Sequence, residues 1–112
     1  FFHRFYITQG YTNFALAGMA QFQGAELYSA NLQGVYLACV NFDSADFYKA
    51  VFDSASLTES SFQNVTGLTL VQLSKVKTLY KSTLDSALLD SIKRFYPQLL
   101  EKPKDWPVGW PP

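Results

Sequence analysis

The sequence predicts an all-β solenoid closed by a short helical C-terminal cap, and two observations lead to this fold class. Residues 20–64 divide into nine consecutive units of five, in which the first residue is small and the third is Phe or Leu. The residues that follow lose this period, show helix start signals and end in a run rich in proline. An internal repeat of fixed period is typical of a solenoid built from stacked short units.

Each unit must hold one turn, because its period matches no regular element. Neither the 3.6-residue helix nor the two-residue strand keeps every fifth residue on one face. An extended segment places the first and third residues of one unit together, and a turn keeps the next pair on the same side. We therefore expect short strands and turns that stack at about 4.8 Å, with the third residues in the core. These residues are Phe22, Leu27, Leu32, Leu37, Phe42, Phe47, Phe52, Leu57 and Phe62.

The units ANLQG at 30–34 and ADFYK at 45–49 show the pattern most fully. They read Ala, then Asn or Asp, then Leu or Phe, then two variable residues. In this pattern residues 20–64 resemble the pentapeptide-repeat family. The resemblance implies a right-handed, four-sided β-helix, in which one coil takes four units and residues 20 apart stack.

Stacking at this interval would place like residues above one another. Phe22, Phe42 and Phe62 would form one column of the core. Tyr28 and Tyr48 would stack on an outer face. A stacked aromatic pair stabilises β-structure, and an exposed pair also suits a protein interface, so both interpretations stay open.

We expect three regions along the chain. Residues 1–66 make the β-helix, within which residues 1–19 form either a degenerate first coil or an irregular aromatic cap. Residues 67–102 make a helical C-terminal cap, and residues 103–112 make an extended Trp/Pro-rich tail. The chain opens on Phe1 rather than Met, which we interpret as the edge of a processed chain or of a longer one.

The cap is predicted to hold two helices. Thr69 and Gln72 have the spacing of a capping box, which favours a helix from Leu70 to about Lys75. Asp85 is placed as the N-cap of a second helix over about residues 86–95. This part of the sequence also resembles the region that follows the repeats in many bacterial members of the family.

Charge and residue chemistry exclude several function classes. Nine basic and nine acidic residues cancel over the chain, while residues 20–64 hold five acidic residues and one basic, a net charge of −4. His3, the one histidine, lies next to the start of the chain, where it is poorly placed to act as the base of a catalytic triad, and the one cysteine, Cys39, gives no Cys cluster for a metal. Acidic residues such as Asp43 are expected at outer positions that face water. We expect no catalytic residue, cofactor, metal or nucleic-acid partner, and no membrane span in this chain.

The sequence favours a non-catalytic scaffold or protein–protein interaction module, an accessory component of a larger assembly. A barrel filled by side chains leaves no cavity for a substrate, whereas its outer faces present regular rows of side chains. The candidate partner-binding residues are Tyr28 and Tyr48 on the barrel and Trp106 and Trp110 in the tail. The alternative, implied by the family resemblance, is a DNA-mimic regulator of a type II topoisomerase. In either case the expected partner is a protein.

Overall fold

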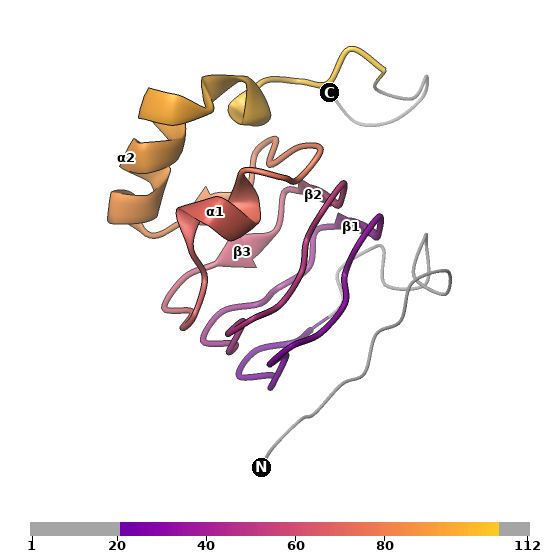
Figure 1. The fold of residues 1–112 in the computed structure, drawn as a ribbon, viewed down its shortest axis with the longest axis vertical. Coiled ribbons are helices and arrows are strands. Elements are labelled where there is room, and N and C mark those ends of the chain that lie inside the picture. Colours follow the sequence, from indigo (N-terminus) through magenta and orange to yellow (C-terminus); the bar gives the residue numbers. More distant parts are fainter. Residues whose placement is uncertain (1–20, 106–112) are drawn as a thin grey trace.

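The computed structural model describes residues 21–105, which stack on themselves at an interval of 20 residues (Figure 1). Gln21 forms an isolated parallel bridge with Asn41. Strand β1 (Tyr36–Ala38) pairs in parallel with strand β2 (Ser56–Thr58) at the same interval. We call the successive turns of the chain the first, second and third levels; they comprise residues 21–40, 41–60 and 61–82, and Thr83 begins the next one.

Each level turns at the fifth residue of a unit, where the backbone has a positive φ. The N–H of Ala45 donates to the carbonyl oxygen of Phe42 at 3.0 Å, and Ala25 donates to Phe22 at the same distance. Between the first pair lies Ser44, with a φ of 64°. A type II turn requires this left-handed conformation at its third residue. We call these turn residues corners, and the others are Gly24, Ser29, Gly34, Cys39, Lys49, Ser54, Glu59 and Asn64.

One side of the stack is also joined by serine hydroxyls. The N–H of Val40 donates to Ser60 Oγ at 3.2 Å, and the N–H of Ser60 donates to Ser82 Oγ at 3.1 Å. The Ser82 hydroxyl donates in turn to the carbonyl oxygen of Leu57 at 2.5 Å. The hydroxyls of Ser60 and of Ser82, which follows it by 22 residues, therefore link each level to the next.

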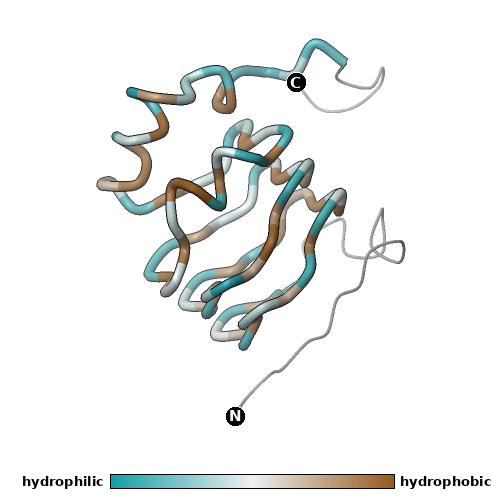
Figure 2. Tube along the Cα trace, in the orientation of Figure 1, coloured by the Kyte–Doolittle hydropathy of each residue, from teal (hydrophilic) through white to brown (hydrophobic). Residues whose placement is uncertain are grey.

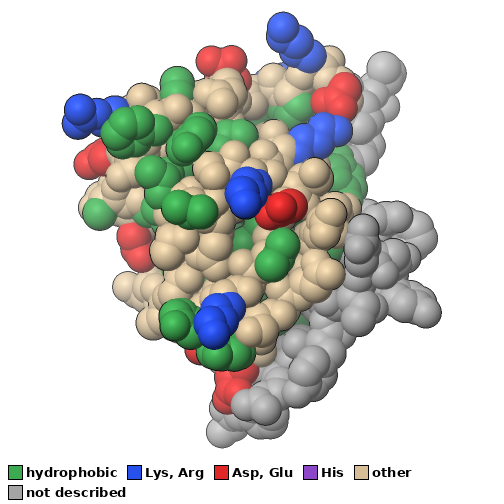
Figure 3. Space-filling model, viewed as in Figure 1, with side chains coloured by type: hydrophobic (Ala, Val, Ile, Leu, Met, Phe, Trp, Pro, Cys, Tyr) green, Lys and Arg blue, Asp and Glu red, His purple; other side chains and the backbone are tan. Residues whose placement is uncertain are grey.

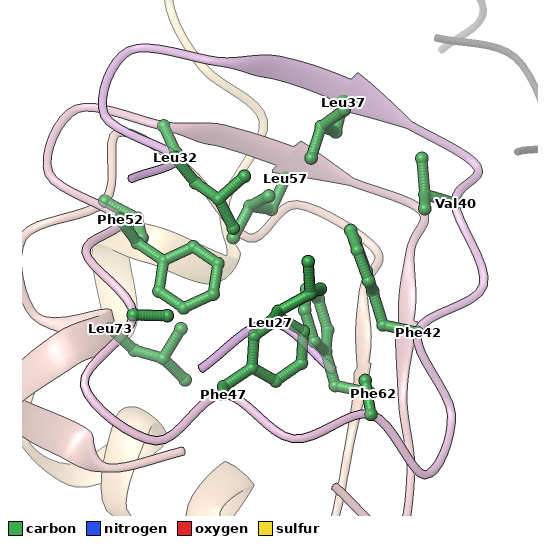
Figure 4. Close-up of a cluster of buried hydrophobic side chains, with 14 of the residues drawn as sticks. Leu27, Leu32, Leu37, Val40, Phe42, Phe47, Phe52, Leu57, Phe62 and Leu73 are labelled. Atoms are coloured by element: carbon green, nitrogen blue, oxygen red, sulfur yellow. The ribbon is translucent and has the colours of Figure 1, made fainter. Parts of the chain in front are cut away.

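Phe and Leu side chains meet inside the levels, pointing inward from all sides (Figure 4). The Phe22 and Phe42 rings stack with centroids 5.6 Å apart, and the Phe42 and Phe62 rings with centroids 5.2 Å apart. The predicted column of phenylalanines is therefore confirmed. The small first-position residues, such as Ala25 and Ala45, are buried beside the large ones. Along the trace, hydrophobic positions alternate with hydrophilic ones (Figure 2).

The third level is two residues longer than the levels below it. Thr66 still lies opposite Asp46 at the interval of 20. Strand β3 (Ser61–Phe62), however, pairs with strand β4 (Thr83–Leu84) at an interval of 22. Helix α1 (Leu70–Leu73) lies between these two pairings and takes up the added length. Parallel stacking thus resumes after the five-residue period is lost.

The capping box predicted for α1 is present, although the helix is shorter than predicted. Thr69 Oγ1 accepts from the N–H of Gln72 at 3.3 Å, and Gln72 Oε1 accepts from the N–H of Thr69 at 2.7 Å. Gln72 Nε2 also donates to the carbonyl oxygens of Phe47 and Ala50, both at 2.9 Å. The Gln72 side chain thus supplies the second level with donors where the backbone has left the stack.

Helix α2 (Ser86–Phe95) and the 3₁₀-helix η1 (Pro97–Leu100) lie over the third level (Figure 1). Ile92 of α2 and Leu99 of η1 are buried in the hydrophobic core. The N–H of Leu79 donates to the carbonyl oxygen of Leu99 at 2.8 Å. Residues from η1 therefore provide the acceptor that a further level would otherwise provide. Helix α2 has the bounds that the sequence predicts.

Asp85 occupies the predicted N-cap position of α2, but the expectation that its side chain caps this helix is wrong. Its carboxylate makes no capping hydrogen bond and instead accepts from the N–H of Asn64, at 3.2 Å to Oδ2 and 3.3 Å to Oδ1. At the equivalent corner one level below, the N–H of Ser44 donates to the backbone carbonyl oxygen of Gln63 at 2.9 Å. The Asp85 carboxylate takes the place of that backbone acceptor, and this use competes with helix capping.

Candidate protein-interaction surface

Tyr28 and Tyr48 stack on the outside of the first and second levels. Their ring centroids lie 5.3 Å apart with the ring planes inclined by 39°. The two residues are 54% and 52% exposed. The predicted stacking of this pair is therefore confirmed, and it leaves a continuous strip of aromatic surface in contact with water.

Hydrogen bonds between the levels hold the two rings in register. The N–H of Ser29 donates to the carbonyl oxygen of Tyr48 at 2.8 Å, and the N–H of Leu27 donates to that of Asp46 at 2.9 Å. Asp46 Oδ1 accepts from the N–H of Tyr48 at 3.0 Å, as aspartates commonly do at turns. The rings therefore stand on a fixed backbone, which lowers the entropy lost when such residues are used in binding.

Charged groups flank the rings on the same outer side. Glu26 and Asp46 lie opposite each other in a parallel bridge, two residues before the tyrosines. Lys49 Nζ lies 5.6 Å from the centroid of the Tyr48 ring, within the range of a cation–π interaction. We call the set of Glu26, Tyr28, Asp46, Tyr48 and Lys49 the tyrosine face.

Gly67 ends the tyrosine face at the third level. Its φ is +72°, and a Cβ at this position would lie 2.5 Å from the backbone nitrogen of Tyr48. Only glycine fits so close an approach between the two backbones. The next residue, Leu68, packs against the hydrophobic core, so the exposed strip does not continue beyond the second level.

Trp106 and Trp110, the other residues predicted to bind a partner, lie outside the described residues, as do residues 1–19. The chain that leads to them is held at Asp105, whose Oδ2 accepts from Lys77 Nζ at 2.7 Å. This hydrogen bond is the main cause of a raised pKa for Lys77 and a lowered pKa for Asp105. Both side chains are more than half exposed, so the pair ties the tail to the surface of the stack with little net stabilisation.

Asp43 does not simply face water, and the sequence-based expectation for it is wrong. Its Oδ1 accepts from the Ser61 hydroxyl at 2.5 Å and from the N–H of Gln63 at 2.9 Å. Both partners belong to the third level, so the carboxylate joins two levels. The signal was the stacking interval, because Gln63 follows Asp43 by 20 residues and brings its N–H within reach.

Within residues 21–105, no group of three or more His, Cys, Asp or Glu side chains could hold a metal ion. Cys39 is exposed at a corner with a φ of 58°. Several aspartates of this range, Asp43, Asp46 and Asp85, accept hydrogen bonds from backbone N–H groups. No helix in the same part of the chain is long and apolar enough to cross a membrane.

The repeat units match a known family model. The model, described as pentapeptide repeats, matches residues 20–64 in eight copies. The matched range is the one that holds the nine units counted in the sequence. No curated protein and no solved structure matches the chain.

Proposed function

We propose, because residues 20–64 belong to the pentapeptide-repeat family, that this protein is a non-catalytic scaffold or protein–protein interaction module. It acts in this proposal as an accessory component of a larger assembly. Each level is then one coil of a right-handed, four-sided β-helix. The interval of 20 residues between paired positions supports this fold, because it equals four units of five.

In the same proposal, residues 1–66 form the β-helix and residues 67–102 its cap. The burial of Ile92 and Leu99 over the third level supports a capping role. A cap provides partners for backbone groups that the last level of a β-helix would otherwise leave open to other chains.

The filled interior supports a function on the outer surface. The large side chains inside the levels, among them Phe42, Phe47 and Phe52, are fully buried (Figure 4). Protein interiors packed in this way have the density of organic crystals. The protein's own side chains therefore take the space inside the levels, and a partner meets the outer faces.

The tyrosine face is the observation that carries the proposal. Tyr28 and Tyr48 leave half of their surface open to water on a fixed backbone. Covering about 100 Å² of each ring would contribute roughly 2–3 kcal/mol per residue. Tyrosine and tryptophan are frequent among the few residues that dominate interface energies. Because tryptophan is one of these residue types, we propose Trp106 and Trp110 as a second pair of anchors.

A pull-down from the native source tests the role of the tyrosine face. The baits are the wild-type chain, the Tyr28→Ser/Tyr48→Ser double variant and the Phe95→Ser variant. Phe95 is a matched control, because it is 58% exposed on α2 and has the Arg94 guanidinium 5.3 Å from its ring. We expect the wild type and the control to capture one set of proteins that the double variant loses. Equal capture by all three baits would refute a binding role for the face.

The proposed tryptophan anchors need a separate bait. A chain that ends at Asp105 lacks Trp106 and Trp110 but keeps the hydrogen bond to Lys77. We expect this bait to capture the partner less well than the wild type. Unchanged capture would leave the tyrosine face as the proposed binding surface and remove the tryptophans from it.

The alternative, a DNA-mimic regulator of a type II topoisomerase, has weaker support. Duplex DNA presents one charge per about 1.7 Å, so a mimic of about 10–15 Å, the height of three stacked levels, needs about six to nine charges. Residues 20–64 carry a net charge of −4, and the Asp43 carboxylate is engaged between levels. Inhibition of a type II topoisomerase by the purified protein in a DNA-supercoiling assay would favour this alternative instead.

A further inference from the structure

We propose that the tyrosine face binds a short, extended segment of a partner protein that carries Arg or Lys side chains. The cations of this segment lie against the rings of Tyr28 and Tyr48 and beside the carboxylates of Glu26 and Asp46. The inference rests on the proposed interaction function and specifies the chemistry of the partner.

The arrangement of the face repeats one pair of groups on two levels. Within a unit, the carboxylate belongs to the bridged residue and the ring to the turn residue two positions later, on either side of a buried Leu or Phe. Glu26 and Tyr28 form this pair on the first level, and Asp46 and Tyr48 form it on the second. A cation placed between a carboxylate and a ring meets negative charge on one side and the negative face of the ring on the other.

A cation of the chain itself already lies over one ring of this face. Lys49 Nζ lies over the Tyr48 ring, 5.6 Å from its centroid. Asp46 uses Oδ1 to accept from the N–H of Tyr48, and a carboxylate has further lone pairs for a second donor. Lys49 is therefore a competitor for the partner's cation at the second level.

The charge of the surrounding repeats favours a basic partner over an acidic one. Residues 20–64 carry a net charge of −4, whereas residues 67–112 hold seven basic and four acidic residues, a net charge of +3. Glu26 and Asp46 are stacked like charges, and a cation between them reduces their repulsion. A basic segment is thus attracted to the repeats and repelled by the C-terminal region.

The size of the face favours a segment over a folded partner. A unit of five residues spans at most about 16 Å and two levels span about 10 Å, whereas a stable interface buries about 800 Å² on each side. In Figure 3 the hydrophobic side chains on the visible side form separate patches, and a Lys or Arg lies among those at the lower edge. A second copy of the chain would gain too little area here, while four or five extended residues would cover the face.

Titration of ¹⁵N-labelled protein with synthetic peptides tests the inference. The probes are nine-residue peptides in which Gly alternates with Arg, with citrulline or with Glu. Citrulline has the shape of Arg without its charge. We expect the Arg peptide to shift the amide signals of residues 25–29 and 45–49, at an affinity about tenfold above that of the citrulline peptide and lowered by salt.

Variants of the aromatic groups separate the face from the rest of the surface. The Tyr28→Ser/Tyr48→Ser variant should weaken binding of the Arg peptide about tenfold or more, and Phe95→Ser should leave it unchanged. Lys49→Gln should strengthen binding about two- to fivefold, because it removes the competing cation. Strengthening is a result that loss of structure cannot produce.

Variants of the carboxylates provide a second, independent readout. Glu26→Gln together with Asp46→Asn keeps the shapes of both side chains and the oxygen that accepts from the N–H of Tyr48. This double variant should bind the Arg peptide about fivefold or more weakly than the wild type, and salt should affect its binding less. Asp90→Asn, an exposed position of α2, is the matched control and should change nothing.

Three outcomes would overturn the inference: equal binding of the Arg and citrulline peptides, shifts that map away from the tyrosine face, or stronger binding of the Glu peptide. If the pull-down still depends on Tyr28 and Tyr48 while the Arg peptide fails to bind, the basic-segment inference is wrong and the interaction module stands. If the pull-down does not depend on these residues, the proposed function of the face fails first.

Discussion

Gly67→Ala should destabilise the protein far more than the same change at its other left-handed glycines. The added Cβ would lie 2.5 Å from the nitrogen of Tyr48 and 2.6 Å from its Cα, atoms that belong to a backbone held between levels. The φ of +72° adds the cost of a side chain in left-handed backbone, about 1–2 kcal/mol. Overpacking contributes about 1–3 kcal/mol, and the stiffer unfolded chain offsets about 0.4–1 kcal/mol. These terms sum to about 1–4.6 kcal/mol, and we expect a net loss in the middle of that range, about 2–4 kcal/mol.

Gly24 and Gly34 provide matched controls for the strain alone. Their φ values are +69° and +70°, and nothing lies within 4 Å of a Cβ added at either position. Alanine there should cost about 1 kcal/mol or less after the unfolded-state offset. The excess loss at Gly67 therefore measures its contact with the backbone of Tyr48.

Urea and thermal denaturation followed by circular dichroism measure these differences. A loss of about 2–4 kcal/mol should lower the Tm by roughly 10–20 °C in a domain of this size, and the controls by a few degrees. Equal losses in all three variants would refute the close approach of the two levels at Gly67. A loss at Gly67 smaller than at the controls would refute the placement of the third level itself.

Three further predictions concern single side chains. Phe42→Asp should abolish the cooperative thermal transition, because it places an unpaired charge between stacked rings in a fully buried position. A cooperative transition with a Tm near that of the wild type would contradict the placement of Phe42 in the core. Asp43→Ala should cost about 1–2 kcal/mol in urea denaturation, because Ser61 loses its acceptor in the second level, and a loss within error of zero would remove Asp43 from that role. Asp105→Asn should speed protease cleavage near residue 105 and leave the Tm close to that of the wild type, because both partners of the pair are exposed. The hydrogen bond between Asp105 and Lys77 should be present above pH 3.8 and lost as the pH falls through the lowered pKa of Asp105, which an NMR titration of the Asp105 carboxyl carbon follows.

The regular part of the fold could be predicted because each unit fixes its own local geometry. A small first residue, a large third residue and a turn at the fifth repeat without interruption from Ala20 to Asn64. The interval of 20 came from the resemblance to the pentapeptide-repeat family, which implies four units per coil, and with it came the stack of Phe22, Phe42 and Phe62. The stacking of Tyr28 on Tyr48 follows from the same implied interval.

The third level could not be predicted from the period, because its register depends on an insertion. Helix α1 adds two residues, after which Leu79 and Leu84 again occupy buried positions. Counting by fives from Phe62 misses both residues. A search that allowed an interval of 22 would have aligned Leu57 with Leu79 and Phe62 with Leu84.

The polar side chains between levels were predicted least well. Asp85 stands where a helix cap is expected, yet its carboxylate satisfies the N–H of Asn64. Asp43 stands at an outer position, yet it accepts from two groups of the next level. In both cases the carboxylate binds a backbone N–H that is distant in sequence, that of Gln63 or Asn64. Without the carboxylate this N–H would lack an acceptor within the stack.

The corners have a practical consequence for experiments on this protein. Ser44, Lys49 and Glu59 carry a hydroxyl, an ammonium and a carboxylate on the same left-handed backbone, and each is exposed. The chemical nature of a corner side chain is thus largely independent of the fold. Cys39, the single thiol of the chain, occupies such a corner next to β1. The strands of Leu37 and Leu57 lie across the core from Leu27 and Phe47, the residues that directly precede the two tyrosines (Figure 4). A fluorophore coupled to this thiol would report tumbling and association from the side away from the tyrosines, without any engineered residue.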